Sequence, residues 1–270
     1  MFIIIIAFIV IFLIVLLIRT KSGKSFNDKM YGINQLGFQQ EVPYWRGIPF
    51  TRLSQAYFVG TLYGLVQNPS DFIGALLLKW VKENRITIIK KDDKIYFDMN
   101  KVTKFEDKYE SKIYLKLLAS SGSNYLLEQQ EFVNFFKTED TIDLLRNIFG
   151  NIEDDFVNSG VFKKEVVGTT YKYFLDENLE KKAYEMAGLK KFLLNFSKIQ
   201  DKNSEEVILW EDYLIYAQLM GIADKVQDQF AEFYPNYNHI VEFNIMKQSV
   251  FVSLKDTFRI MSRIISINVR

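Results

Sequence analysis

The chain of 270 residues has no cysteine, one histidine (His239) and only four prolines. Without cysteine it can form no disulfide, thiolate zinc site, iron–sulfur cluster or thiol nucleophile. A single imidazole is too few for most metal sites and disfavours a Ser-His-Asp triad. We therefore expect no catalytic, metal-binding or cofactor-binding residues, and we interpret His239 as a structural or surface residue.

What the sequence does contain is a long apolar run at its start: residues 2–18 are apolar throughout, without charge, proline or glycine. A bilayer core needs about 20 apolar residues in a helix, with a lower limit near 17. The run predicts one transmembrane helix over residues 1–18. A cleaved signal peptide and a buried core helix are the alternatives, but a signal peptide carries its positive charge before the apolar run.

Three basic residues directly after the run orient it: Arg19, Lys21 and Lys24. The positive-inside rule places basic flanks in the cytoplasm. We expect a single-pass protein of the cell membrane, with its N-terminus outside, its bulk cytoplasmic and the lipid bilayer as its first partner.

Charge is sorted along the rest of the chain, although the formal net charge is only +1. Residues 19–104 hold 14 Lys/Arg and 7 Asp/Glu (+7), residues 105–235 hold 15 and 24 (−9), and residues 236–270 hold 5 and 2 (+3). Basic segments beside an anchor are attracted to anionic lipid. The gradient favours a first domain held at the membrane and an acidic one facing the cytoplasm, unless solvated faces simply differ.

The fold class that we predict is mainly α with small β-hairpins (α+β): one N-terminal transmembrane helix, tandem winged-helix-like modules and a C-terminal helical subdomain. Helices are expected at 54–65, 70–84, 106–120, 128–136, 139–158, 178–199, 205–220 and 222–233, and hairpins at 86–97 and 161–174. The domains are a transmembrane helix (1–18), a linker (19–43), a basic helix–helix–hairpin module (44–104), an acidic winged-helix-like module (105–176), a helical subdomain (177–235) and a basic amphipathic tail (236–270). The tail can lie on the membrane or pack on the domain.

Two blocks in the C-terminal third resemble a known family. They are Gly188-Leu189-Lys190-Lys191-Phe192-Leu193, and the stretch that runs from Leu209-Trp210-Glu211-Asp212-Tyr213 to Met220-Gly221-Ile222-Ala223. They resemble the C-terminal signature of the YciQ-like predicted bacterial membrane proteins, which contain a domain of unknown function, and the similarity extends more weakly back to Tyr44. It implies a membrane location and an uncharacterised role, and it brings no catalytic residues. Members of that family carry an extracytoplasmic domain and a hydrophobic hairpin that this sequence lacks, so the chain resembles a shortened, single-pass relative.

Other motifs weigh against catalysis. Gly23-Lys24-Ser25 imitates the end of a phosphate-binding loop, but the position that requires glycine is Ile18. Adjacent acids such as Asp154-Asp155 point about 100° apart on a helix and do not converge on one substrate atom. Trp210, Tyr213 and Tyr216 could form a recognition stripe, and core packing is the favoured interpretation.

The candidate interaction surface is basic and lies in the first module: Lys82, Arg85, Lys90, Lys91 and Lys94. We expect a non-catalytic, membrane-anchored scaffold that binds an unidentified protein partner. The alternative is a membrane-tethered winged-helix regulator that binds nucleic acid through the basic module. The acidic module argues against it, because nucleic-acid affinity comes mostly from neutralised phosphates.

Overall fold

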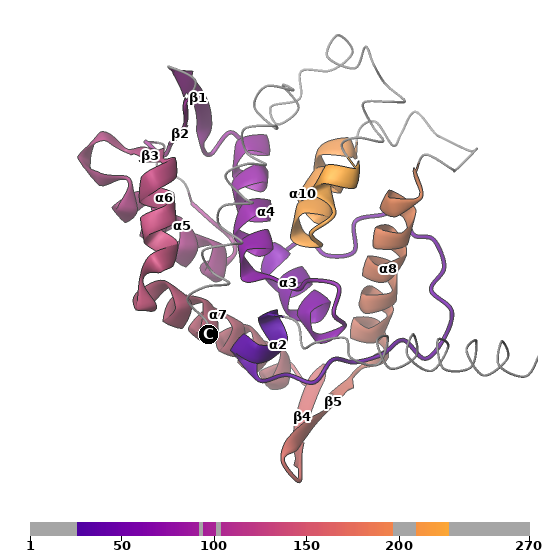
Figure 1. Ribbon diagram of the computed structural model, residues 1–270. Coiled ribbons are helices and arrows are strands. Elements are labelled where there is room, and N and C mark those ends of the chain that lie inside the picture. Colours follow the sequence, from indigo (N-terminus) through magenta and orange to yellow (C-terminus); the bar gives the residue numbers. More distant parts are fainter. Residues whose placement is uncertain (1–25, 92–93, 101–103, 197–208, 227–270) are drawn as a thin grey trace, which may run out of the picture.

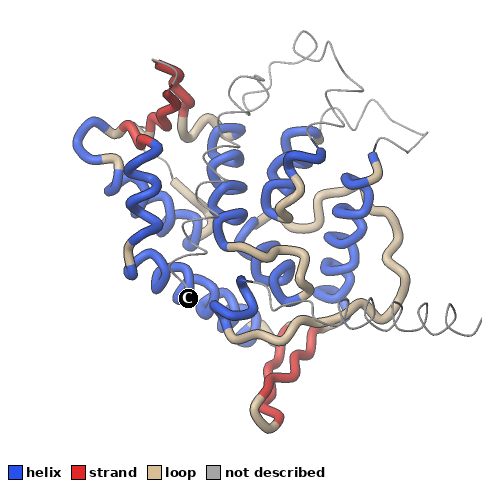
Figure 2. The backbone as a smooth tube through the Cα atoms, viewed as in Figure 1, coloured by secondary structure: helices blue, strands red, loops and turns tan. Residues whose placement is uncertain are grey.

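The computed structural model describes residues 26–91, 94–100, 104–196 and 209–226, which form a helical body with two small sheets at its edge (Figures 1 and 2). Its described helices are α2 (Phe26–Tyr31), α3 (Leu53–Leu62), α4 (Pro69–Lys82), α5 (Lys108–Ser120), α6 (Gln129–Lys137), α7 (Glu139–Asn158), α8 (Glu177–Leu194) and α10 (Trp210–Leu219). The strands are β1 (Thr87–Lys91), β2 (Lys94–Asp98), β3 (Leu126–Glu128), β4 (Phe162–Val167) and β5 (Thr170–Leu175), and a short 3-10 helix spans Gly122–Asn124. The mixed α+β class is confirmed for these residues.

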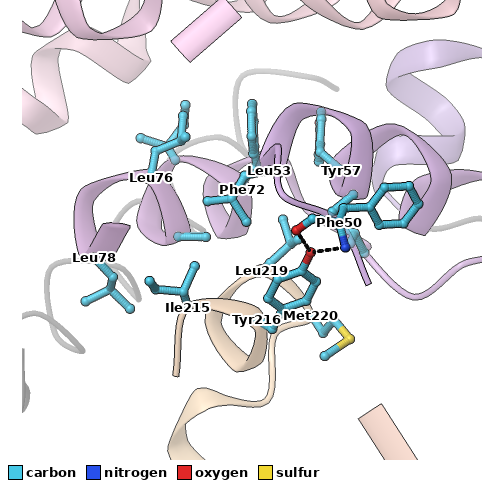
Figure 3. Close-up of a cluster of buried hydrophobic side chains, with 14 of the residues drawn as sticks. Phe50, Leu53, Tyr57, Phe72, Leu76, Leu78, Ile215, Tyr216, Leu219 and Met220 are labelled. Atoms are coloured by element: carbon cyan, nitrogen blue, oxygen red, sulfur yellow. Dashed lines mark hydrogen bonds between the residues drawn. The ribbon is translucent and has the colours of Figure 1, made fainter. Parts of the chain in front are cut away.

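The centre of the body is the pair α4 and α10, which lie side by side in Figure 1. Helix α4 begins where the sequence signals it, because Asn68 accepts from the Ser70 backbone N–H at 3.0 Å and Pro69 holds the first helical position. Gly74 lets the helices approach closely, since a Cβ there would lie 2.9 Å from Nε2 of Gln218. Apolar side chains of α3, α4 and α10 fill the space between these helices (Figure 3).

Two antiparallel sheets flank the helices. The first has the order β1-β2-β3, with Lys91 paired to Lys94 and Phe97 to Leu127. The second is the hairpin β4–β5, which protrudes from the lower edge of the body in Figure 1. Strand β3 therefore joins residues on both sides of the predicted domain boundary at 104/105. The domain division itself stays a prediction.

The predicted elements agree with the described ones, apart from three differences. Lys90, Lys91 and Lys94, expected in a charged turn, lie in strands that pair up to Lys91 and Lys94. Strand β3 and helix α2 were not predicted, because each is too short to give a periodic signal. One local prediction is confirmed: Gly221 follows α10 with φ of +66°, the left-handed conformation expected of a glycine at the end of a helix.

Several predictions fall on residues that the structure does not describe: the anchor over 1–18, the first residues of the 205–220 helix, His239 and the tail over 236–270. Among the described residues, no helix combines the length and apolarity needed to cross a bilayer.

Candidate functional site

An extended segment, residues 39–50, runs along α8 and α10, and we call it the strap. Side chains of α8 bind the backbone at the N-terminal end of the strap. The Tyr184 hydroxyl accepts from the backbone N–H groups of Gln39 at 2.9 Å and Gln40 at 3.0 Å. The Lys191 ammonium donates to the Val42 carbonyl at 2.8 Å. An irregular segment cannot pair its own backbone groups, so these contacts supply the partners that a helix or sheet would give.

Gly188 sets the distance between α8 and the strap. A Cβ at this position would lie 2.5 Å from the Pro43 carbonyl oxygen and 2.8 Å from Cβ of Trp45. Both are closer than real Cβ contacts, and the first neighbour is backbone. Only glycine allows the strap to pass at this height over the helix.

Helix α10 holds the C-terminal end of the strap through two tyrosines. The Tyr213 hydroxyl donates to the Arg46 carbonyl at 2.7 Å, and the Arg46 guanidinium lies 5.4 Å from the centre of the Phe192 ring. The Tyr216 hydroxyl accepts from the Phe50 backbone N–H and donates to the Phe50 carbonyl (Figure 3). Burial raises the pKa of Tyr216 far above the usual value, so the hydroxyl keeps its proton.

These contacts decide between the two interpretations of the aromatic stripe. Trp210, Tyr213 and Tyr216 are 1%, 0% and 2% exposed, so core packing is confirmed. No pattern in the sequence predicted that the two tyrosine hydroxyls bind the backbone of the strap. The hydroxyl groups of Tyr213 and Tyr216 bind the backbone of the strap. We call Tyr184, Gly188, Lys191, Tyr213 and Tyr216 the clamp, because they fix the strap to α8 and α10.

A cleft of about 900 Å³ lies beside the clamp, where α3, α5, α7 and α8 meet. Its floor is apolar, with Phe50, Ile152, Phe156 and Leu179 among its lining residues. Its rim and walls carry charges of both signs: Arg52, Lys108, Lys181 and Lys182, and Glu106, Asp107, Asp155, Asp176 and Glu185, of which Asp107 and Glu185 are buried.

Most rim carboxylates are fixed by contacts within the protein. Asp107 caps α5 by accepting from the Tyr109 N–H at 2.9 Å and also accepts from the Ser54 hydroxyl. Asp176 caps α8 by accepting from the Leu179 N–H at 2.7 Å. Glu185 pairs with Lys182 at 3.0 Å.

Asp155 accepts from the Tyr109 hydroxyl at 2.6 Å and from Lys108 at 2.9 Å. The hydrogen bond from Lys108 lowers the pKa of Asp155. Burial, with the Asp155 contact adding to it, raises the pKa of Tyr109 to about 12. Tyr109, Lys108 and Asp155 thus form a hydrogen-bonded group in the lining of the cleft, a contact between α5 and α7 that the sequence analysis did not predict.

The clamp residues lie in the one part of the chain for which a matching protein family was found. Residues 177–230 match a family described as predicted membrane protein (DUF2207), C-terminal domain. The match covers 54 of the 270 residues (177 to 230), namely α8, α10 and what lies between and just after them. No protein with a curated description and no solved structure matches the chain.

This match supports, at the family level, the resemblance seen in the sequence, and it indicates membrane association. The finer assignment to YciQ-like proteins, the single span and its orientation stay predictions. Gly188, Lys191, Tyr213 and Tyr216, which hold the strap, all lie within the matched residues.

The structure places the predicted interaction residues in two groups. Lys82 pairs with Asp212 at 2.5 Å and thereby ties α4 to α10. Arg85 pairs with Glu83, donates to the Lys104 carbonyl at 2.7 Å and lies over the Phe105 ring at 4.6 Å. Lys90, Lys91 and Lys94 lie on β1 and β2, where the structure describes the backbone alone. Arg19, Lys21 and Lys24 lie outside the described residues.

A second, smaller recess of about 400 Å³ is lined by two half-buried groups of opposite charge that sequence reasoning missed. Asp71 in the first turn of α4 and Lys190 of α8 line it together with Gly221. Burial raises the pKa of Asp71 to about 7, against the opposing effect of Lys190. Lys190 itself donates to the Leu65 carbonyl at 2.9 Å. Across the described residues, no group of three histidine, aspartate or glutamate side chains is arranged to hold a metal ion.

Proposed function

We propose that the protein is a membrane-anchored scaffold, facing the cytoplasm, that binds a protein partner in the cleft between α3, α5, α7 and α8 and catalyses no reaction. The observation that carries the proposal is the composition of this cleft, an apolar floor inside a rim of both charge signs. Protein interfaces have this anatomy, with a desolvated apolar centre and a polar edge. A partner segment with an apolar side chain and charges of both signs would fit it.

Binding is favoured over catalysis by what the rim carboxylates already do. Asp107 and Asp176 cap helices, Asp155 is held by Tyr109 and Lys108, and Glu185 pairs with Lys182. A general acid or base has to reach a substrate proton with its pKa near the working pH. Carboxylates committed to caps and ion pairs are suited to shaping a binding surface.

The clamp supports the anchored part of the proposal. The strap follows α2 in the chain, and α8 and α10 hold it through six hydrogen bonds to its backbone: two accepted by the Tyr184 hydroxyl, one each donated by Lys191 and Tyr213, and two made by the Tyr216 hydroxyl. The clamp thereby fixes the chain just after α2, the first described helix beyond the predicted anchor, to α8 and α10. The membrane association indicated by the match to residues 177–230 agrees with this role.

Site-specific photocrosslinking tests the proposal. A photoreactive residue replaces Lys181, an exposed residue of the cleft rim, in the full chain expressed in cells. The expected result is one discrete crosslinked protein after extraction of the membranes with detergent. The matched control replaces Lys112, an exposed lysine of α5 outside the cleft, and should give no such product. Equal products from both positions, or none from Lys181, would contradict the proposal.

The alternative is a winged-helix regulator that binds nucleic acid. The observation that favours it is the element order from α5 to β5, helix, strand, helix, helix, strand, strand, which is the order of a winged helix, although β3 pairs with β2 and not with the β4–β5 hairpin. A gel-shift assay at physiological salt tests it. Salt-sensitive binding by the parent protein that Lys90→Glu and Lys91→Glu abolish would replace the scaffold proposal. If neither the parent nor the variant binds nucleic acid, the scaffold proposal stands.

A further inference from the structure

The hairpin β4–β5 exposes four apolar side chains, three of which (Val166, Val167 and Tyr171) lie beside its turn. Val166 is 74% and Val167 54% exposed, and Tyr171 and Phe174 are also exposed. Of the nine large apolar side chains exposed among the described residues, these four lie in one hairpin of fourteen residues. Single exposed apolar residues are ordinary, but a cluster of them marks an interaction surface.

The base of the hairpin is rooted in the core, so the tip is presented rigidly. Phe162 is buried and meets the Phe58 ring edge-on at 5.3 Å, and Tyr173 stacks on Phe162 at 5.8 Å. Lys164 pairs with Glu153 of α7 at 2.8 Å. Gly168, with φ of +62°, holds the first central position of the two-residue turn, as a type II′ turn requires. The hairpin thus ends in a tight tip that Figure 1 shows projecting beyond the helices.

Charge on the hairpin is opposite to that of its surroundings. Residues 162–175 carry three lysines and one glutamate, a balance of +2, inside a segment of balance −9. Lys163 is paired with Glu165 at 2.5 Å and remains exposed, and Lys172 lies over the Phe174 ring at 4.8 Å. The hairpin is therefore locally basic, which the net charge of residues 105–235 as a whole does not reveal.

The order of side chains from the tip matches the profile of a membrane interface. Val166, Val167 and Tyr171 come first, and the Lys172 and Lys163 positions lie roughly 7 and 13 Å behind the turn at the rise of a strand. Apolar groups reach the acyl boundary, aromatic rings favour the headgroup level, and lysines meet lipid phosphates. A nucleic acid would meet the valines before the lysines and offer them nothing apolar.

The position of the hairpin fits the predicted anchor. Tyr31 of α2 stacks on Phe149 of α7 at 4.0 Å, and α7 packs against β4, so the start of the described chain and the hairpin share one side of the body. Residues 19–25 between the predicted span and α2 can reach at most about 28 Å. A bilayer entered by residues 1–18 would lie within that distance of α2.

We propose that the β4–β5 tip is a second membrane contact, which inserts Val166 and Val167 into the interface of an anionic bilayer while Lys163 and Lys172 bind its phosphates. It fixes the tilt of the body relative to the membrane, which a single point of attachment leaves open. The inference goes beyond the scaffold proposal and does not depend on the cleft having a partner.

The lack of native cysteine makes a direct test possible, because Val166→Cys gives a chain with one thiol. The full chain, spin-labelled at this thiol, is reconstituted in nanodiscs of phosphatidylcholine alone or mixed with phosphatidylglycerol. We expect collisions of the label with oxygen to rise several-fold, and collisions with a water-soluble nickel chelate to fall, in the anionic nanodiscs. A label at Leu115→Cys on α5, 59% exposed, is the matched control and should stay aqueous.

The charge reversals Lys163→Glu and Lys172→Glu, made together, should return the Val166 label to its value in neutral nanodiscs. Both side chains are exposed, so the variant should stay folded, but it should unfold at a somewhat lower urea concentration than the parent because Glu165 loses Lys163 and faces a like charge at position 172. A Val166 label that stays aqueous in both lipids overturns the proposal. So does a label that becomes shielded only when a DNA duplex or a membrane-protein extract is added, which would assign the tip to nucleic acid or to a protein partner.

Discussion

The Tyr216 hydroxyl is both donor and acceptor for one residue, Phe50: it accepts from the backbone N–H at 3.1 Å and donates to the carbonyl at 2.8 Å (Figure 3). The two residues are 166 positions apart in the sequence. One side chain of α10 therefore completes the backbone hydrogen bonding at the point where the strap turns into α3.

Tyr216→Phe should destabilise the protein by about 1–3 kcal/mol, because it leaves a buried N–H and a buried carbonyl without partners. Urea unfolding of the detergent-solubilised chain measures the loss. Tyr44→Phe, the same change at a strap tyrosine that is 50% exposed, is the control and should be neutral. Equal effects of the two changes would show that the Phe50 contacts contribute no stability.

Gly188→Ala should destabilise the protein by about 1–3 kcal/mol, because the new methyl group would overlap the Pro43 backbone. The strap should also become sensitive to limited proteolysis under native conditions. Gly150→Ala in α7 is the matched control: a Cβ there meets nothing within 4 Å, and alanine should stabilise that helix by up to about 1 kcal/mol. An unprotected strap in the parent protein would argue against the clamp.

Asp71 predicts a dependence of stability on pH. Its pKa of about 7 in the folded protein lies above its ordinary value of 3.8, so between these values the folded state binds the proton and the unfolded state does not. The free energy of unfolding therefore falls as pH rises through this window, by about 2–4 kcal/mol.

Asp71→Asn removes this titration, so the substitution should stabilise the protein more at pH 8 than at pH 5. Urea titrations of both chains at the two pH values measure the difference. Asp143→Asn on the exposed face of α7 is the control and should change stability alike at both pH values. A pH-independent effect of Asp71→Asn would mean that its carboxylate is solvated.

Glu110 joins α5 to α4 and is 4% exposed. It accepts from Lys79 at 2.8 Å and from Nε1 of Trp80 at 2.5 Å, and burial raises its pKa. Glu110→Ala should cost about 2 kcal/mol or more, since it leaves the indole N–H and one partner of Lys79 unpaired. Glu110→Gln should cost less, and Asp143→Ala, which breaks an exposed pair with Arg146, under about 0.5 kcal/mol. Thermal unfolding ranks the three.

Local sequence signals predicted most elements because they depend on short-range physics. Asn68 and Pro69 begin α4, and residues 139–158 form α7 as their periodicity indicates. Strand β3 escaped prediction, because three residues have no period and Leu127 is a strand residue only through its pairing with Phe97.

The functional surfaces were harder to predict. Two of the five lysines and arginines chosen from charge alone, Lys82 and Arg85, are engaged in internal contacts. The basic β4–β5 hairpin was missed inside an acidic segment, since only its projection from the body separates its lysines from that background.

The sequence by itself determined the chemistry available to this protein and the positions of most of its described helices. It excluded thiol chemistry through the missing cysteine, and it predicted an apolar anchor, a helical body and buried aromatics in α10. Only the tertiary structure decided what those aromatics hold. Tyr213 and Tyr216 meet backbone groups about 166 residues away, and such a contact leaves no mark in either segment's own pattern. The same holds for Gly188, whose missing side chain becomes meaningful only when Pro43 passes above it.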